Sequence, residues 1–490
     1  MQLIVAEDHA IKDHTTRNII GKHAVMLTFK PLVISGREVL PIVEGGKGIS
    51  VSNGESSGAW AASGGVGTFS GVNADSYDAD GKLMEQRYHG RTRRERHEEL
   101  IAHSIRGGIA QARIAHESSN GNGRIHMNIL WEMAAAERIL NGVLEGAKGL
   151  IHGVTCGAGM PYKIAEICAR YGVYYYPIIS SARAFRALWK RSYHKFRDGL
   201  GAVVYEDPWL AGGHNGLSNA EDPRQPEAPL PRIVELRKQM NEFGLQSTPI
   251  VMAGGVWCLN EWGEFLDNPA VGPIAFQFGT RPLLTRESPI SKEWKQRLLT
   301  LKQGDILLHR FSPTGFYSSA VINPFLVELD ARSKRQIPYS TAPIGEMTEA
   351  LAVGARGRKV YVGLADRAHA MEWMTAGFTE GLRTPDSTII FVAPSRAAEI
   401  HRDQVDCMGC LSACMFSNWA QTEQGSTGKK SDPRSFCIQK TLQDIAHTSD
   451  VDTQLMFAGH NAYRFASDPF YADGFIPSVK QLVERIHTGA

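Results

Sequence analysis

The chain has 490 residues, 43% of them hydrophobic and 21% charged, which is the composition of a globular protein with a sizeable core. This length exceeds the size at which one core stops growing, so we expect one large domain and an appended region. The 53 basic and 51 acidic residues leave a net charge of only +2, which excludes a field strong enough to attract nucleic acid or an anionic membrane. We therefore expect a small-molecule partner, no nucleic acid and no membrane.

The beginning of the chain lacks the pattern of a targeting signal. MQLIVAEDHAIKDH places acids where a signal peptide would need a basic stretch and a long apolar run. No segment reaches the roughly 18 uninterrupted apolar residues that a membrane span requires. We expect a cytoplasmic protein in which residues 1–37 form an N-terminal extension. The sequence leaves the oligomeric state open, a homo-oligomer included.

One unit recurs along the first half of the chain: a short strand-like run, a glycine-bearing turn and a helical stretch. Strands that alternate with helices pair in parallel, and eight such units in about 250 residues have the size of a closed (β/α)8 TIM barrel. The rival is an open doubly wound sheet, which should show GxGxxG after its first strand and an acid after its second, and neither is present. The eight predicted strands are 40–43, 67–69, 124–129, 149–154, 174–179, 202–205, 249–252 and 273–278.

Weaker strand and helix signals continue beyond the barrel. KVYVGL and STIIFVAP are strand-like runs in the last third of the sequence. We predict an α/β protein with a barrel over residues 38–330 and an appended α/β region over residues 331–490.

Two glycine loops follow the last two predicted strands. One contains Gly254 and Gly255, and the other contains Gly279 and Thr280. The loops after strands seven and eight of a TIM barrel commonly bind phosphate, because glycine lets backbone N–H groups approach the oxygens and a threonine hydroxyl adds a donor. Turns account for many glycine pairs, but two such loops on consecutive strands favour a phosphate site.

A histidine follows the sixth predicted strand. His214 lies in AGGHNG beside Gly213, where a barrel residue faces the active site. An imidazole can accept a proton from a carbon acid or stabilise a developing anion. The alternative is a histidine bonded to its own loop; we expect the catalytic role. Other polar or aromatic residues at strand ends are expected to support the pocket wall: His152, Glu206, Asp207 and Trp209.

The barrel motifs resemble, in order, those of the nitronate monooxygenase family, also called the 2-nitropropane dioxygenase family, which includes FMN-type enoyl reductases. They are LPIVEGGKGISVSN, ASGGVGTFSGVN, IHMNIL, GAGMP, PIISSARA, LAGGHNG, IVMAGGVW and AFQFGTRPLLT. The resemblance implies an FMN-binding TIM-barrel oxidoreductase in which His214 is catalytic. It also implies that Gly45, Gly46 and Asn128 line the isoalloxazine ring. The further cofactor-binding residues that it implies are Gly213, Gly254, Gly255, Gln277, Gly279 and Thr280.

Four of the seven cysteines cluster near the end of the chain. Cys407, Cys410, Cys414 and Cys437 have the spacing C-x2-C-x3-C-x22-C. Four thiolates suit a 4Fe–4S cluster or a tetrahedral zinc ion, and the run resembles the cluster loop of dienoyl-CoA reductases. We expect metal ligation rather than four free thiols, and iron–sulfur rather than zinc because a flavin can use an electron carrier.

These features lead to three functional hypotheses. The first is an FMN enzyme that oxidises alkyl nitronates or nitroalkanes with dioxygen, with His214 handling the proton or the negative charge. The second is an NAD(P)H-dependent reductase of a quinone or an enoyl thioester that uses the iron–sulfur cluster. The third is a protein that binds flavin or metal without catalysis, against which the pocket histidine argues.

Overall fold

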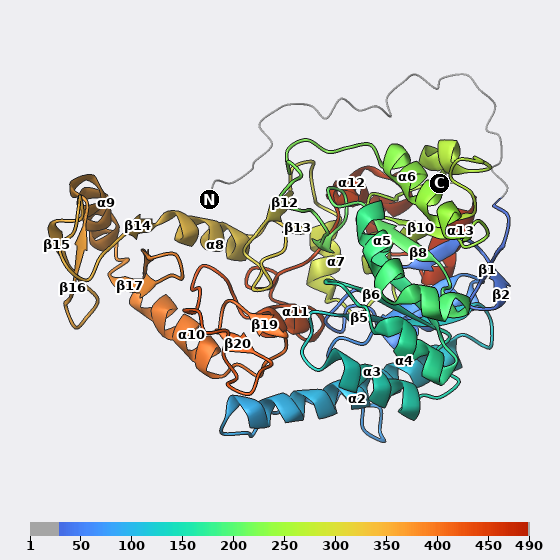
Figure 1. Ribbon diagram of the computed structural model, residues 1–490, viewed down its shortest axis with the longest axis horizontal. Helices are drawn as coiled ribbons and strands as arrows, with labels where there is room; N and C mark the ends of the chain where they lie inside the picture. The colour runs from blue at the N-terminus through green and yellow to red at the C-terminus, as the bar shows by residue number, and fades with distance from the viewer. Residues whose placement is uncertain (1–28, 489–490) are drawn as a thin grey trace.

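The computed structural model describes residues 29–488. Eight parallel strands close into a barrel in the order β10-β11-β3-β4-β5-β6-β7-β8, so the predicted TIM barrel is confirmed (Figure 1). The barrel strands are β3 (Ile42–Glu44), β4 (Val66–Ser70), β5 (Arg124–Leu130), β6 (Gly153–Gly157), β7 (Tyr174–Ile179), β8 (Val203–Glu206), β10 (Ile250–Ala253) and β11 (Ile274–Phe278).

The predicted first and last residues of most strands differ from the observed ones by at most two positions. The predicted run 174–179 coincides with β7. The predicted run 149–154 begins too early, because β6 starts at Gly153. Gly149 has a φ of 81°, a left-handed conformation that interrupts an extended run. Residues 149–152 therefore belong to the connection before the strand.

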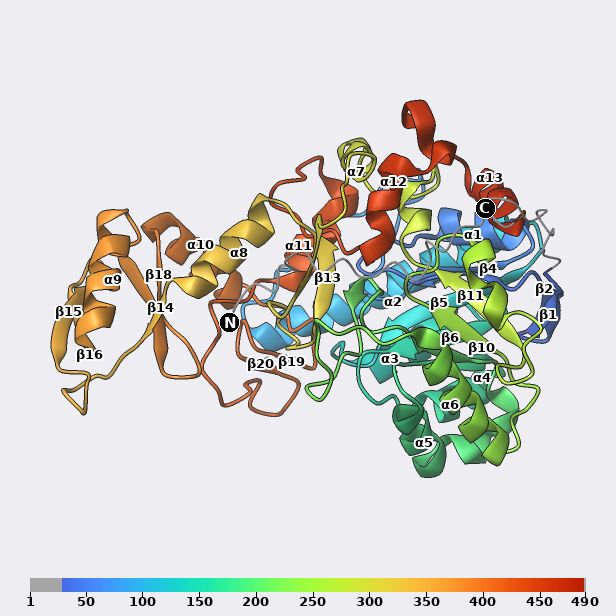
Figure 2. The same cartoon turned by 90° about the horizontal axis from the view of Figure 1, so that it is seen from above.

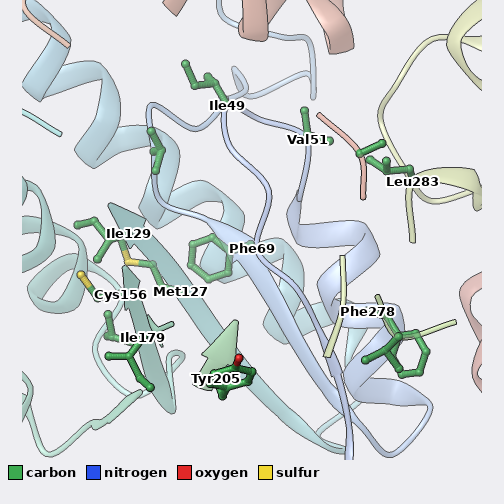
Figure 3. Packing of buried hydrophobic residues seen from close by; sticks show 14 of the residues in the cluster. Ile49, Val51, Phe69, Met127, Ile129, Cys156, Ile179, Tyr205, Phe278 and Leu283 are labelled. Atoms are coloured by element: carbon green, nitrogen blue, oxygen red, sulfur yellow. The ribbon is translucent and has the colours of Figure 1, made fainter. Parts of the chain in front are cut away.

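Alternate residues of the strands form two separate apolar clusters. Val43, Val66 and Val251 belong to the cluster that fills the barrel. Ile34 and Val39 join this cluster from the hairpin β1 (Leu32–Ile34) and β2 (Arg37–Val39), which closes the bottom of the barrel. The intervening residues pack outward in the larger cluster, and Figure 3 shows part of that layer, including Phe69, Met127, Ile129 and Tyr205.

Helices surround the barrel. The final helix α13 (Val479–His487) packs against α1, so the end of the described chain returns to the barrel. The helices between barrel strands are α1 (Gly54–Ala62), α2 (Arg93–Ser118), α3 (Ala136–Gly146), α4 (Ile164–Tyr171), α5 (Ala182–Arg191), η1 (Tyr193–Gly199), α6 (Pro229–Glu242) and η2 (Leu259–Phe265). No helix within residues 29–488 is long and apolar enough to cross a membrane.

A hairpin and a small outlying module follow the barrel. The elements up to the module are η3 (Arg281–Leu284), α7 (Lys292–Leu298), β12 (Ile306–His309), β13 (Ser318–Val321) and α8 (Pro324–Lys334). The module itself comprises β14 (Gln336–Pro338), β15 (Glu349–Val353), β16 (Arg358–Val362), α9 (Leu364–Thr375), β17 (Glu380–Arg383), β18 (Thr388–Val392) and α10 (Pro394–Val405). Both views place β15, β16 and α9 at the end of the molecule farthest from the barrel (Figures 1 and 2).

The remaining elements return to the barrel and share its outer core. They are β19 (Ala413–Cys414), β20 (Trp419–Ala420), α11 (Ile438–His447), η4 (His460–Tyr463), α12 (Arg464–Ser467), η5 (Pro469–Gly474) and α13. The predicted appended α/β region is therefore present. Its proposed boundary at residue 330 falls inside α8 and stays a prediction.

Candidate active site

A cavity opens at the mouth of the barrel, above the carboxyl ends of the strands. Its lining includes Asn128 from β5, Ile178 from β7, Glu206 from β8, and Ala253 and Gln277 from β10 and β11. Active sites of TIM barrels lie on this face, because the loops that follow the strands converge there. All ten residues predicted for catalysis or cofactor binding line this cavity: Gly45, Gly46, Asn128, Gly213, His214, Gly254, Gly255, Gln277, Gly279 and Thr280.

The loop after β3 lies directly on the side chain of Asn128. A Cβ at Gly46 would stand 2.2 Å from the Asn128 Cβ, so only glycine permits this approach. Gly45 donates its N–H to the Phe278 carbonyl at 2.9 Å, which holds the same loop against the end of β11. The loops after β3 and β11 are thus fixed side by side.

The two predicted phosphate loops provide a glycine-lined wall. Gly254 and Gly255 have φ values of 88° and 76°, which L side chains rarely adopt. A Cβ at Gly279 would meet no protein atom within 4 Å, so the backbone there faces open space on the cavity wall. Thr280 Oγ1 accepts a hydrogen bond from the Gly459 N–H at 3.0 Å. The wall therefore leaves room for a group that contacts the backbone closely.

His214 reaches the cavity from the short strand β9 (Gly213–His214), which pairs with β13. Its Nε2 lies 2.6 Å from Ser312 Oγ, and its ring meets Phe457 edge-on at 5.3 Å between centroids. Burial lowers the pKa of His214 to about 4. The imidazole is therefore neutral at pH 7 and is held in one orientation.

Two neighbouring carboxyl groups at the end of β8 have different environments. Burial, with a smaller contribution from the Asp207 charge, raises the pKa of Glu206 to about 8. Burial also raises the pKa of Asp207 to about 6, although its Oδ1 accepts N–H groups of Trp209 at 3.0 Å and Leu210 at 2.9 Å. Asp207 thus organises the turn, whereas Glu206 presents a neutral carboxyl to the cavity at pH 7.

Lys47 adds a cation to the cavity wall that we did not predict from the sequence. Its Nζ donates to the Gly45 carbonyl at 2.7 Å and lies 3.4 Å from Glu44 Oε1. Burial lowers the pKa of Lys47, and the Glu44 carboxylate opposes that shift. The sequence contains the GGKG run, but it does not reveal that the buried Glu44 carboxylate holds Lys47 at the cavity wall.

A second unpredicted contribution comes from residues 457–461 near the end of the chain. Asn461 Nδ2 donates to the Gly255 carbonyl at 2.6 Å, and Gly459 lies so close to Leu210 that a Cβ would stand 2.8 Å from its carbonyl oxygen. A signal existed: the Gly-His-Asn of 213–215 recurs at 459–461. Both copies lie at the cavity wall.

Comparison with known proteins identifies the family. The model of the nitronate monooxygenase family matches residues 132–489, well over half of the chain. The chain belongs to the nitronate monooxygenase family. It is therefore a flavin-dependent oxidoreductase, and the family implies FMN as its cofactor. No curated protein matches the chain.

Three solved structures that are similar to this chain are distant in sequence. FabK from Thermotoga maritima is 15% identical, with 91% of each chain covered and a TM-score of 0.46. Nitroalkane oxidase from Streptomyces ansochromogenes is 14% identical, covering 94% of this chain and 96% of that one, with a TM-score of 0.49. The enoyl reductase domain of MlnA from Bacillus amyloliquefaciens is 12% identical, covering 92% and 93%, with a TM-score of 0.51. The last likeness supports the shared fold.

The residues of this nitronate monooxygenase family member fit FMN. Gly254 and Gly255 have left-handed backbones, and the space beside Gly279 is open. Backbone N–H groups on this wall can therefore bind a phosphate. The side-chain amides of Asn128 and Gln277 line the cavity as well and have the donors and acceptors that a flavin ring requires.

The four cysteines predicted as metal ligands are all within the described chain, and Cys410 lines the cavity. No three His, Cys, Asp or Glu side chains between residues 29 and 488 are arranged to hold one metal ion. This structure therefore supports neither the expected 4Fe–4S cluster nor the zinc alternative at Cys407, Cys410, Cys414 and Cys437.

Proposed function

We propose that the protein oxidises alkyl nitronates, or the nitroalkanes from which they form, with dioxygen as the oxidant. The observation that carries this proposal is the position of His214, whose half-buried imidazole is neutral at pH 7 and lies on the same cavity wall as the glycine loops. FMN, when bound, supplies the two-electron acceptor for the substrate and the donor for dioxygen. The chain itself must bind the substrate, exclude water and manage one proton.

His214 is suited to that proton. Its pKa is low because burial disfavours the charged ring. When a nitroalkane loses its α-proton, the resulting anion beside the ring favours the imidazolium and raises the pKa of His214. The ring can therefore accept the proton as the negative charge forms, and the Ser312 hydroxyl at Nε2 keeps it oriented.

The rest of the cavity favours an apolar substituent on the reacting carbon. Val72, Met133, Leu283 and Met456 line the space around the polar groups. Apolar walls exclude water and strengthen the attraction between the imidazolium and the anion.

The test is anaerobic reduction of the purified flavoprotein in a stopped-flow spectrometer. Mixing with an alkyl nitronate should bleach the flavin absorbance within the turnover time, and dioxygen should restore it. A flavin that stays oxidised with the nitronate but is bleached by NADPH would reject this proposal. A flavin that neither reagent reduces would indicate a carrier without this activity.

A second candidate is reduction of an enoyl thioester by NAD(P)H. The observation that favours it is an apolar stretch of the same cavity formed by Leu100 of α2 and by Leu442 and Ile445 of α11. These side chains have the chemistry to bind an acyl chain. Bleaching by NADPH followed by reoxidation with a long-chain enoyl thioester, rather than with dioxygen, would support this candidate.

A further inference from the structure

The segment that follows α11 lies against both glycine loops of the cavity. Gly459 donates its N–H to Thr280 Oγ1 at 3.0 Å, and Asn461 Nδ2 donates to the Gly255 carbonyl at 2.6 Å. These hydrogen bonds join residues that are 179 and 206 positions apart in the chain. Because the two loops follow β10 and β11, one short stretch of chain bridges the ends of both strands.

A second set of contacts joins the residues that come directly after these loops. Trp257 Nε1 donates to Asp468 Oδ2 at 2.9 Å. Arg281 Nη2 lies 3.8 Å from the same carboxylate oxygen, and Arg281 Nε donates to the Tyr471 hydroxyl at 3.2 Å. Trp257 follows the first glycine loop and Arg281 follows the second. The Asp468 carboxylate therefore connects the two loops a second time.

The burial of Arg281 makes this carboxylate important. The Arg281 side chain is fully buried, and a buried guanidinium costs free energy unless hydrogen bonds and an opposite charge compensate it. Arg281 Nη1 donates to the Trp257 carbonyl at 2.7 Å, and Asp468, 14% exposed, provides the opposite charge. If residues 457–471 moved away, the guanidinium would lose its carboxylate. The loop after β11 and this segment are therefore most stable together.

The same segment also forms part of the cavity surface, because Gly459 and Asn461 line the cavity. Asn461 Nδ2 is bonded to Gly255, but Asn461 Oδ1 has no hydrogen-bond partner among the described residues. Asn461 Oδ1 is also not one of their buried polar atoms that lack a partner, so it remains accessible. The segment thus holds the glycine loops and adds an amide oxygen to the wall that they form.

We propose that residues 457–471 form one wall of the FMN phosphate site, and that FMN binding and docking of this segment are coupled. Backbone N–H groups bind a phosphate most tightly when they are held in place beforehand. Asn461 and Asp468 are positioning residues, since they act through the loops that they hold. Coupling of this kind is reciprocal: bound FMN stabilises the docked segment, and the docked segment raises the affinity for FMN. This inference goes beyond the proposed reaction and does not depend on its substrate.

The first test measures the affinity of the full chain for FMN, by fluorescence titration of the flavin-free protein. Asn461→Ala removes the donor that holds Gly255 and should weaken FMN binding by roughly 10-fold. Asp468→Asn removes the charge beside Arg281 and keeps an acceptor for Trp257; it should weaken binding by a similar factor. Asn241→Ala, which changes an exposed asparagine of α6, is the matched control and should bind FMN normally. The unfolding temperature of each flavin-free variant reports whether the fold is retained.

The second test needs no substitution. Amide hydrogen exchange of the unaltered chain, followed by mass spectrometry, should become slower in residues 457–471 when FMN is added. The β15–β16 hairpin of the outlying module should exchange at the same rate with and without FMN. In Asn461→Ala a saturating concentration of FMN should slow exchange in residues 457–471 less, which a purely structural role of Asn461 would not produce.

Two outcomes would overturn the proposal. One is FMN that protects the glycine loops while exchange in residues 457–471 stays unchanged. The other is equal FMN affinity in Asn461→Ala and Asn241→Ala. Neither test includes a nitronate, so failure of this coupling and failure of the proposed reaction can be told apart.

Discussion

His214 Nε2 lies 2.6 Å from the hydroxyl of Ser312, 98 residues farther along the chain. The contact exists because β9 pairs with β13, so the hairpin that follows the barrel folds back over the site. Ser312 Oγ is also 2.8 Å from Thr314 Oγ1. The barrel therefore supplies the histidine, and the segment after the barrel orients it.

Replacement of this histidine should separate catalysis from cofactor binding. His214→Ala should keep FMN and lower turnover of a nitroalkane by roughly 10²-fold or more, the usual loss for a general base. Steady-state kinetics with flavin content measured on the same samples checks this. His401→Ala, an exposed histidine on α10, is the matched control and should behave as the unaltered protein. Wild-type turnover in His214→Ala would make the histidine structural.

The sequence predicted the parts of the site that are local in the chain. Gly45, Gly254 and Gly279 each directly follow a barrel strand, and His214 lies on the short strand β9 in the connection after β8. The topology of a barrel brings strand ends and the loops that follow them together without further information. Ser312 could not be predicted in the same way, because its role depends on the β9–β13 pairing across a long separation.

The same limit applies to strand boundaries and to the final segment. Predicted strand 149–154 included a left-handed glycine at 149, since an apolar run alone does not reveal a turn. Asn461 contacts Gly255 because the chain returns from the outlying module. Hydrophobic periodicity does not indicate this return, and the recurrence of Gly-His-Asn at 459–461 was its one signal in the sequence.

Acid should destabilise the protein through histidines that are buried in the neutral form. Among the described residues, burial lowers the pKa of six rings: His97, His126, His152, His214, His309 and His460. Between pH 6.5 and about 4 the unfolded chain binds more protons than the folded one, so the free energy of unfolding falls as the pH falls. A fully buried ring contributes on the order of 1.4 kcal/mol per unit of pKa shift.

His309→Gln provides the test of this acid dependence, because His309 is buried and outside the proposed chemistry. Its unfolding temperature should fall less steeply than that of the unaltered protein between pH 6.5 and 4 in scanning calorimetry. His401→Gln should leave the slope unchanged. Identical slopes for all three proteins would mean that His309 does not remain neutral in the folded state.

Glu206 should act in the opposite direction at higher pH. Its folded pKa of about 8 lies above the ordinary 4.5, so the folded state holds a proton that the unfolded state has released. Stability associated with this proton is present below pH 4.5 and is lost as the pH rises to about 8. Glu206→Gln keeps the neutral shape, so its advantage in unfolding temperature over the parent should grow from pH 5 to pH 8 and then level off. A constant difference would contradict the raised pKa.

The glycine at the end of β11 allows the cofactor site to be tested without disturbing the fold. A Cβ at Gly279 meets no protein atom within 4 Å, so Gly279→Ala should leave the unfolding temperature of the flavin-free protein unchanged. The added methyl group points into the space that we assign to FMN, and it should weaken FMN binding by roughly 10-fold, about 1.4 kcal/mol. Fluorescence titration of the flavin-free protein measures this.

Gly263→Ala is the matched control. A Cβ at Gly263 also meets no atom within 4 Å, but Gly263 is outside the cavity lining, so this variant should bind FMN normally. Gly46→Ala should lose both stability and FMN, because its Cβ would stand 2.2 Å from that of Asn128. Unchanged FMN affinity in Gly279→Ala would place the cofactor elsewhere in the cavity.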